Sequence, residues 1–182
     1  HDWTDIHPRT LKHDPPLLYR GRISPTTFER MTDHIINLYF KHPSHWKIAG
    51  RPYFSVYDLT ALAASFGSLD ATRQALEHFR AKTKAAGFPD LHLNAVVWGN
   101  TILPGEQKPA DAAAVVKGLG FDSVTSYVWI HHVALPDFPT TDYGYVKDKY
   151  FEYWAQAEKM FGAVPYYPNA TMGWDSSPRA DP

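Results

Sequence analysis

Four segments with the composition of buried strands alternate with segments of helical periodicity, and this alternation restricts the fold more than any other feature of the sequence. The strand-like segments are residues 51–57, 91–98, 121–129 and 164–172. They recur at spacings of about 30 to 43 residues, which is typical of strand–helix–strand units joined by crossover connections. We therefore predict an α/β fold with about four parallel strands in one domain covering residues 1–182.

The segments around the strands carry signals for helices. Ser24 followed by Pro25 is a typical helix start, because serine caps the first turn and proline fits its first position. Apolar residues at helical spacing then predict a buried stripe of Phe28, Met31, Ile35 and Leu38. The same reasoning predicts helices at residues 59–66, 69–87, 109–119 and 143–161, the second of them capped by Ser68. Residues 1–23 are polar and rich in proline, and we expect a long loop there.

Two parallel architectures fit this pattern, a doubly wound sheet and a (β/α)8 barrel. The dinucleotide-binding form of the doubly wound sheet needs G-x-G-x-x-G directly after a strand. The G-x-G of this chain, Gly118-Leu119-Gly120, precedes a strand instead, and we interpret Gly120 as the C-cap of a helix. A complete barrel takes about 250 residues and eight strands. If the fold is a barrel, we therefore expect the chain to be its middle and later part, continuing beyond both ends in a longer protein.

Charge and composition exclude several classes of protein. The chain has 18 Lys and Arg residues against 19 Asp and Glu residues, without the basic stripe of a nucleic-acid binder. Its longest apolar runs are far shorter than the ~20 residues that cross a bilayer. It has no cysteine, so disulfides, thiolate nucleophiles and Cys-based zinc sites are excluded. We expect no nucleic-acid partner and no membrane segment, and the absence of G-x-S-x-G and Walker motifs argues against serine hydrolases and phosphoryl transfer.

Aromatic and polar residues gather where the predicted strands end. In both α/β architectures the ligand lies beyond the carboxyl ends of the strands. The residues there that we predict to bind a ligand are Tyr57, Asp58, Trp98, Asn100, Tyr127, Trp129, Trp174, Asp175 and Arg179. Aromatic faces stack on sugar rings, while carboxylate, amide and guanidinium groups bind their hydroxyls. One such aromatic residue alone more often packs in a core, but the repetition at four strand ends favours a site.

The sequence offers fewer candidates for catalysis than for binding. Glycosidic chemistry needs two carboxylates about 5–9 Å apart, and no glutamate lies at a predicted strand end. Asp58 also precedes a predicted helix and is equally well interpreted as its N-cap. The adjacent His131 and His132 lack the spacing of a metal motif such as H-E-x-x-H. We expect no metal and no cofactor, and the catalytic residues stay unassigned.

Several short blocks resemble the glycoside hydrolase family 99-like proteins, which are also known as WbsX-type glycosyltransferases. They occur in the family's order along the chain. The most specific block is Gly173-Trp-Asp-Ser-Ser-Pro-Arg179, and a moderately specific one is Gly50-Arg-Pro-Tyr-Phe54 within residues 46–57. Weaker blocks are His1-Asp2-Trp3, Tyr39-Phe40, Ala86-Gly-Phe88 and Gly120-Phe-Asp-Ser-Val124.

The resemblance implies a TIM-type (β/α)8 barrel that acts on polysaccharides, of which this chain supplies about strands four to seven. Hydrolases of the family cut α-mannosidic bonds with retention, and their acidic motif follows the Gly-Trp-Asp-x-x-Pro-Arg block, so we expect the catalytic carboxylates outside this chain. The residues to which the resemblance gives a ligand-facing role are Asp2, Trp3, Tyr57, Trp174, Asp175 and Arg179. We expect Asp175 and Arg179 to form an ion pair at the pocket floor.

The leading expectation is therefore a glycoside hydrolase whose partner is a polysaccharide or oligosaccharide. A glycosyltransferase of surface-polysaccharide assembly is one alternative. It would need a site for a nucleotide-linked or lipid-linked donor, and no phosphate-binding glycine loop is visible. A non-catalytic glycan-binding module is the other alternative, favoured by the missing acid/base pair.

Overall fold

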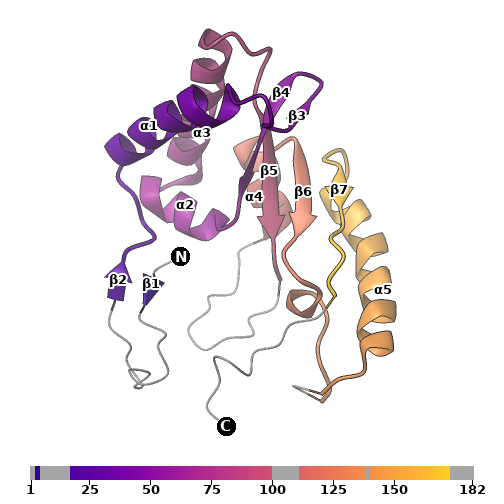
Figure 1. Cartoon of the computed structure of the whole chain (residues 1–182). Coiled ribbons are helices and arrows are strands. Elements are labelled where there is room, and N and C mark those ends of the chain that lie inside the picture. The colour runs from indigo at the N-terminus through magenta and orange to yellow at the C-terminus, as the bar shows by residue number, and fades with distance from the viewer. Residues whose placement is uncertain (1–2, 5–16, 100–110, 138–139, 173–182) are drawn as a thin grey trace.

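A curled, mostly parallel five-stranded sheet with the shape of a half barrel forms the centre of the molecule (Figure 1). The computed structural model describes residues 3–4, 17–99, 111–137 and 140–172. The strands of the sheet, in spatial order, are β3 (Lys47–Ile48), β4 (Arg51–Val56), β5 (His92–Val97), β6 (Ser123–Ser126) and β7 (Tyr166–Tyr167). Strands β4 to β7 are parallel, which confirms the four predicted parallel strands, and β3 pairs antiparallel with β4.

The last strand is much shorter than the predicted segment 164–172. It consists of Tyr166 and Tyr167 alone, between Pro165 and Pro168. Proline has no N–H to donate to a neighbouring strand, so a proline on each side limits the pairing to two residues. A second difference lies near the start of the chain, where β1 (Trp3–Thr4) pairs antiparallel with β2 (Leu17–Tyr19) within the segment predicted as a loop.

The helices agree closely with the sequence prediction in their positions. They are α1 (Pro25–His34), the π-helix η1 (Ile35–Phe40), α2 (Leu59–Phe66), α3 (Leu69–Ala85), α4 (Ala112–Leu119), the 3-10 helix η2 (Trp129–His131) and α5 (Tyr143–Phe161). Ser24 and Ser68 cap α1 and α3 as predicted, each accepting a backbone N–H at 3.1 Å. Gly120 ends α4 with a φ of 72°, which confirms its interpretation as a C-cap.

The helices of the described chain pack on one face of the sheet. The core between them contains Leu93, Ala95 and Val97 of β5 and residues from α1, α3, α4 and α5. Strands in sequential order with helices on one face are characteristic of a barrel wall, whereas a doubly wound sheet reverses its strand order and carries helices on both faces. We refer to the opposite face, which no described helix covers, as the inner face of the sheet (Figure 1).

The buried stripe of the first helix differs from the prediction. Met31 and Leu38 are exposed. The residues that face the core are instead Phe28, Thr32, Ile36 and Phe40. For Leu38 the physical reason is the wider turn of the π-helix, in which a residue three positions after Ile35 leaves the face of Ile35. Met31 lies in the preceding α-helix, where Phe28 and Thr32 face the core. Helical spacing also predicts inward positions for Leu69 of α3 and Met160 of α5, and both are exposed. Next to Met160, Phe161 is buried against Tyr166, with 6.0 Å between the ring centroids.

Charged residues fasten the amino ends of the strands. Asp122, just before β6, accepts hydrogen bonds from Arg80 of α3 at 2.6 Å, from Arg51 of β4 at 3.0 Å and from the Leu93 backbone at 2.9 Å. Burial alone would raise the pKa of Asp122, but these hydrogen bonds and the two positive charges hold it below its ordinary value. Ion pairs therefore hold together the amino end of the sheet.

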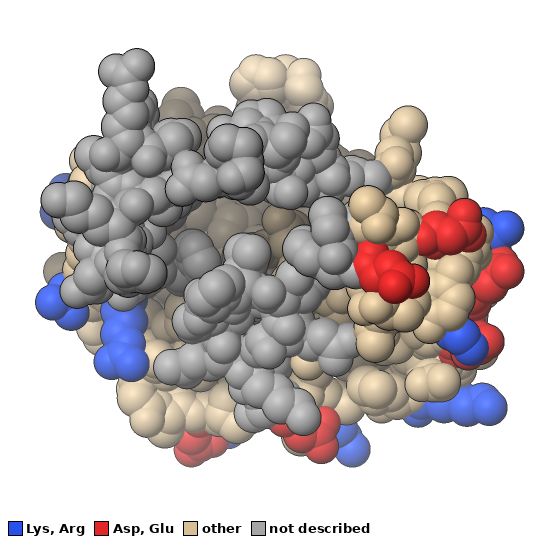
Figure 2. All heavy atoms as spheres, turned by 90° about the horizontal axis from the view of Figure 1, so that it is seen from below, with Lys and Arg blue, Asp and Glu red and all other residues tan. Residues whose placement is uncertain are grey.

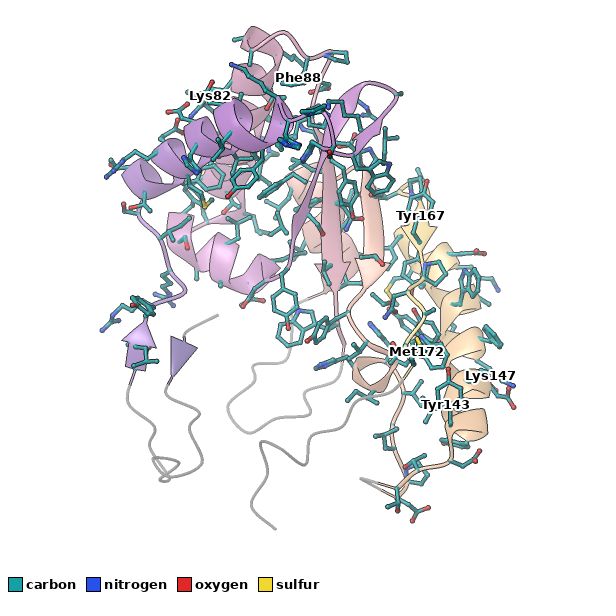
Figure 3. The ribbon with its side chains drawn as sticks, in the orientation of Figure 1. Lys82, Phe88, Tyr143, Lys147, Tyr167 and Met172 are labelled. Atoms are coloured by element: carbon teal, nitrogen blue, oxygen red, sulfur yellow. The ribbon has the colours of Figure 1, made fainter. Side chains whose placement is uncertain are left out.

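A second charged contact fastens α3 to α1. Lys82 of α3 reaches the carboxylates of Glu29 at 3.0 Å and Asp33 at 2.6 Å, and donates to the hydroxyl of Thr32 at 2.9 Å (Figure 3). Burial opposes the charge of Lys82, but the two carboxylates raise the pKa of this ammonium group. The lysine thus satisfies the polar side of the contact between the two helices.

Candidate functional site

Three aromatic side chains meet at the carboxyl ends of adjacent strands. Tyr57 follows β4, Trp98 follows β5 and Tyr127 follows β6. The rings of Tyr57 and Trp98 stack with their centroids 5.7 Å apart, and Tyr127 meets Tyr57 edge-on at 4.9 Å and Trp98 at 6.5 Å. The prediction that these three lie together at one edge of the sheet is confirmed. We refer to Tyr57, Trp98 and Tyr127, together with His131, as the aromatic rim.

His131 completes the rim; it follows the end of a predicted strand but was not among the predicted binding residues. Its ring lies 5.2 Å from both Trp98 and Tyr127, and its side chain is buried. The backbone of Gly99 donates to the carbonyl of His131 at 3.1 Å, which joins the segment after β5 to the segment after β6. The signal in the sequence that could have added it to the predicted binding residues is its position shortly after a predicted strand end.

The rim offers aromatic surface to a ligand. Tyr57 is 40% exposed, and Trp98 and Tyr127 are half-buried. Figure 2 views the molecule from this end of the strands, and the described Lys, Arg, Asp and Glu side chains visible there lie toward the margins. An uncharged aromatic surface suits stacking against a ring with apolar faces better than binding of a phosphate or another strongly charged group.

Asp58 lies beside the rim and caps a helix. Its carboxylate accepts the backbone N–H of Ala61 at 2.8 Å, in the first turn of α2. This confirms the N-cap interpretation, one of the two that the sequence left open. The same contact links the rim to the start of α2, because Asp58 is the next residue after Tyr57.

Trp129 belongs to the packing between the sheet and α5. It is buried, its indole stacks on Tyr150 at 5.0 Å and Tyr143 at 5.5 Å, and its Nε1 donates to the carbonyl of Asn169 at 2.9 Å. These contacts place its ring with α5 and not with the rim, because the chain turns into η2 after Val128 and carries the indole toward the helix. Figure 3 shows Tyr143 of α5 beside Met172, near the end of the described chain.

Asn169 fixes the segment that follows β7. Its amide donates to the carbonyl of Tyr127, and its side-chain oxygen accepts the hydroxyl proton of Tyr150 at 3.0 Å. The Tyr150 hydroxyl is also hydrogen-bonded to that of Tyr166 at 2.9 Å. Burial raises the pKa of Tyr166, so its hydroxyl stays protonated in this network. Asn169 therefore connects the rim backbone at Tyr127 to α5.

The remaining predicted site residues lie in β1 or outside the described part of the chain. Trp3 lies in β1, where its backbone pairs opposite Tyr19. The predicted residues that lie outside the described part of the chain are Asp2, Asn100, Trp174, Asp175 and Arg179. The expected ion pair of Asp175 with Arg179 lies outside it as well.

A line of polar side chains runs along the inner face of the sheet toward the rim. Arg51 Nη2 contacts His92 Nδ1 at 3.2 Å, and His92 Nε2 contacts the Ser123 hydroxyl at 2.8 Å. Ser123 donates to Asn94 Oδ1 at 2.8 Å, and Asn94 Nδ2 donates to Ser55 Oγ at 2.9 Å. His92, Asn94 and Ser123 are almost fully buried, whereas Ser55 is exposed. We refer to these five residues as the polar line.

Sequence reasoning missed the polar line. The signal that could have revealed it is the alternation of His92 and Asn94 with Leu91, Leu93 and Ala95, since alternate residues of a strand face opposite sides of a sheet. Burial lowers the pKa of His92; the nearby Asp122 opposes this effect, and Arg51 and Arg80 add to it. The imidazole is therefore neutral at physiological pH.

Two other kinds of site were sought in the described residues. Over these ranges, His, Asp and Glu side chains form no group of three or more that could hold a metal ion. None of the helices described is at once long and apolar enough to span a bilayer.

Comparison of the chain with protein-family models, curated proteins and solved structures finds no significant match in any of the three. The geometry of the rim and the inner face is therefore the ground on which function is inferred.

Proposed function

We propose that the chain belongs to a carbohydrate-active TIM-type barrel, and that the aromatic rim binds a polysaccharide or oligosaccharide. The observation that carries this proposal is the meeting of Tyr57, Trp98 and Tyr127 at the carboxyl ends of three adjacent parallel strands. In barrels this end is where ligands bind. The sequential strand order and the helices on one face support the barrel part of the proposal.

The chemistry of the rim favours a sugar over other ligands. Pyranose rings have apolar faces that stack on tyrosine and tryptophan, and hydroxyls that need hydrogen-bond partners nearby. The rim supplies the aromatic faces, and Ser55 of β4, an exposed residue with a hydroxyl group, lies two positions before Tyr57. The resemblance to family 99-like proteins points the same way and suggests α-mannosidic linkages.

The reaction we propose is glycoside hydrolysis, with the rim in a binding role. The rim consists of aromatic rings and one imidazole, so we assign to it the positioning of the glycan and not acid–base catalysis. Under the same proposal, the family resemblance gives ligand-facing roles to Asp2, Trp3, Trp174, Asp175 and Arg179, and assigns catalysis to an acidic motif that follows the Gly173–Arg179 block.

A non-catalytic glycan-binding module is the second candidate. The observation that favours it is that Asp58, the carboxylate next to Tyr57, is engaged as the N-cap of α2. Because the proposed catalytic motif lies outside this chain, the two candidates are separated by incubating the full-length protein that carries the chain with a glycan that the chain binds. Release of reducing ends supports a hydrolase, and binding without release supports a module.

Calorimetric titration with a panel of polysaccharides that includes yeast α-mannan tests the proposed binding. We expect one member of the panel to bind and Trp98→Ala to weaken that binding by about tenfold, because stacked aromatic contacts contribute on the order of 1 kcal/mol beyond the area they bury. Trp46→Ala is the matched control, since Trp46 also packs on a tyrosine, Tyr53 at 4.6 Å, but is 61% exposed and precedes β4 at the amino end of the strands.

The proposal is overturned if no polysaccharide of the panel binds the wild-type chain. It is also overturned if a polysaccharide binds with equal affinity to the wild type, Trp98→Ala and Trp46→Ala, because the binding site would then lie away from the rim.

A further inference from the structure

The hydrogen bonds of the polar line run in one direction. A guanidinium only donates, so Arg51 requires His92 Nδ1 to be the acceptor in their 3.2 Å contact. A neutral imidazole with an accepting Nδ1 carries its proton on Nε2, and His92 therefore donates to the Ser123 hydroxyl. Ser123 then donates to the oxygen of Asn94 at 2.8 Å. The donor and acceptor in each hydrogen bond therefore determine the donor and acceptor in the next.

The direction of the line determines what Ser55 can do. Because the amide oxygen of Asn94 accepts from Ser123, its amide nitrogen Nδ2 faces Ser55 and donates to Ser55 Oγ at 2.9 Å. The Ser55 oxygen is thereby used as an acceptor, and its own proton is directed to another partner. Ser55 is exposed, in contrast to the nearly buried His92, Asn94 and Ser123. Its proton is thus presented on the inner face of the sheet.

Ser55 lies close to the rim. It is the last residue but one of β4 and precedes Tyr57, the first residue after the strand, by two positions. Residues two apart in an extended chain face the same side, with their Cα atoms about 6.6 Å apart, so we infer that both side chains lie on the inner face. A sugar ring that stacks against Tyr57 and Trp98 would have one edge facing β4. The Ser55 hydroxyl would be within reach of that edge. This placement is the second observation, independent of the direction of the hydrogen bonds.

We propose that Ser55 is a dedicated hydrogen-bond donor of the glycan site, and that it selects an acceptor-only oxygen of the sugar, such as the ring oxygen. The inference rests on the proposed function of the rim. The buried residues of the polar line act as positioning residues, because they hold the Ser55 oxygen as an acceptor and so orient its proton outward.

Three variants, titrated with the polysaccharide of the panel that the wild type binds, test this role. Ser55→Ala removes the donor and should weaken binding about three- to tenfold, the range of one neutral hydrogen bond. Ser55→Thr keeps the hydroxyl and should bind within about twofold of the wild type. Thr125→Val is the matched control on β6, because the Thr125 hydroxyl already donates to the carbonyl of Tyr167 at 2.6 Å; it should leave the affinity unchanged.

A measurement without ligand tests the direction of the line. Nitrogen NMR of the histidine rings at neutral pH should show His92 as the Nε2–H tautomer in the wild type. The Nδ1–H tautomer would reverse the donors and overturn the inference, whatever the titrations give.

The outcomes separate this inference from the proposed function. If the wild type binds, Trp98→Ala weakens binding and Ser55→Ala does not, the role of Ser55 is wrong and the rim proposal stands. If the wild type binds no polysaccharide, the proposed function fails and the role of Ser55 fails with it. If Ser55→Ala and Thr125→Val weaken binding equally, the effect is a general disturbance of the inner face, and the specific role of Ser55 is wrong.

Discussion

The carboxylate of Asp122 lies 2.6 Å from the guanidinium of Arg80, although 42 residues separate them in the sequence. This ion pair joins the start of β6 to α3, and the same carboxylate also accepts the backbone N–H of Leu93 in β5. Three elements that are distant in the sequence therefore meet at one side chain.

Replacing Asp122 with asparagine should destabilise the protein. We expect the free energy of unfolding at pH 7 to fall by about 2–3 kcal/mol, because two arginines lose their charged partner in a half-buried place. Urea unfolding measures this loss. Asp70→Asn is the control, since Asp70 is 75% exposed in its ion pair with Arg73 and should contribute less than about 1 kcal/mol. Equal losses for both variants would contradict the structural role of Asp122.

The contribution of Asp122 should also depend on pH. Its pKa is lowered in the folded state, so its stabilising effect is present above the ordinary value of 3.8 and is lost as the pH falls through the lower folded value. The difference in unfolding free energy between the wild type and Asp122→Asn should therefore narrow below pH 4. A difference that stays constant from pH 7 to pH 3 would exclude this linkage.

His132 should make the protein sensitive to mild acid. Burial, with a smaller effect of His131, lowers the pKa of His132 to about 4, and the nearby backbone of Val97 opposes this effect only in part. The unfolded chain takes up the proton below about pH 6.5 while the folded one resists it, so stability falls between pH 6.5 and pH 4. We expect the free energy of unfolding to be about 2 kcal/mol lower at pH 5 than at pH 7.

His132→Phe should remove that acid loss and keep the stacking on Tyr153, whose ring lies 4.2 Å from His132. Thermal melts from pH 7 to pH 5 measure the effect, with His78→Gln as the control because His78 is exposed. If His132→Phe loses as much stability as the wild type over this range, His132 is not the group responsible.

The inward face of η1 can be tested with a pair of variants. Phe40 is fully buried and stacks on Phe79 at 5.8 Å, so Phe40→Ala should cost about 3–5 kcal/mol. Leu38→Ala should change stability by less than about 0.5 kcal/mol, because Leu38 is 56% exposed. A denaturant titration measures both losses. If the segment were an ordinary α-helix with Leu38 facing the core, Leu38→Ala would cost more stability than Phe40→Ala.

The two glycines of Gly118-Leu119-Gly120 should respond to alanine with opposite signs. Gly118 is inside α4 with open space around it, so Gly118→Ala should stabilise the protein by about 0.5–1 kcal/mol. Gly120 has a φ of +72°, so Gly120→Ala should destabilise it by about 1–2 kcal/mol. The melting temperatures of the two variants show whether each substitution stabilises or destabilises the protein. A dinucleotide-binding role would instead require both glycines for contact with a ligand.

Local signals in the sequence predicted the positions of the helices and of the parallel strands. Caps such as Ser68 act within one turn, and hydrophobic periodicity acts within one element, so both can be read without tertiary information. The exposure of Leu38 could not be read in this way. The change from α-helix to π-helix after His34 depends on how Phe40 packs among Phe79, Phe54 and Phe88, which come from other parts of the chain.

The rim was predictable because it follows from a rule about strand ends. Tyr57, Trp98 and Tyr127 each stand directly after a strand of a parallel sheet, and the carboxyl ends of such strands share one edge. Trp129 has the same kind of position in the sequence, but α5 competes for its indole, and no local pattern reveals that competition. The partnership of Ser55 with Asn94 joins residues 39 apart and depends on the register of two strands.

The two ends of β4, β5 and β6 are fastened by different forces, and this has an evolutionary consequence. Ion pairs through Asp122 hold the amino ends, and aromatic rings meet at the carboxyl ends. Because the ion pairs hold the strands at the other end, a substitution at position 57, 98 or 127 leaves that contact in place. The side chains of the rim can therefore change in evolution while the ionic end of the sheet stays the same.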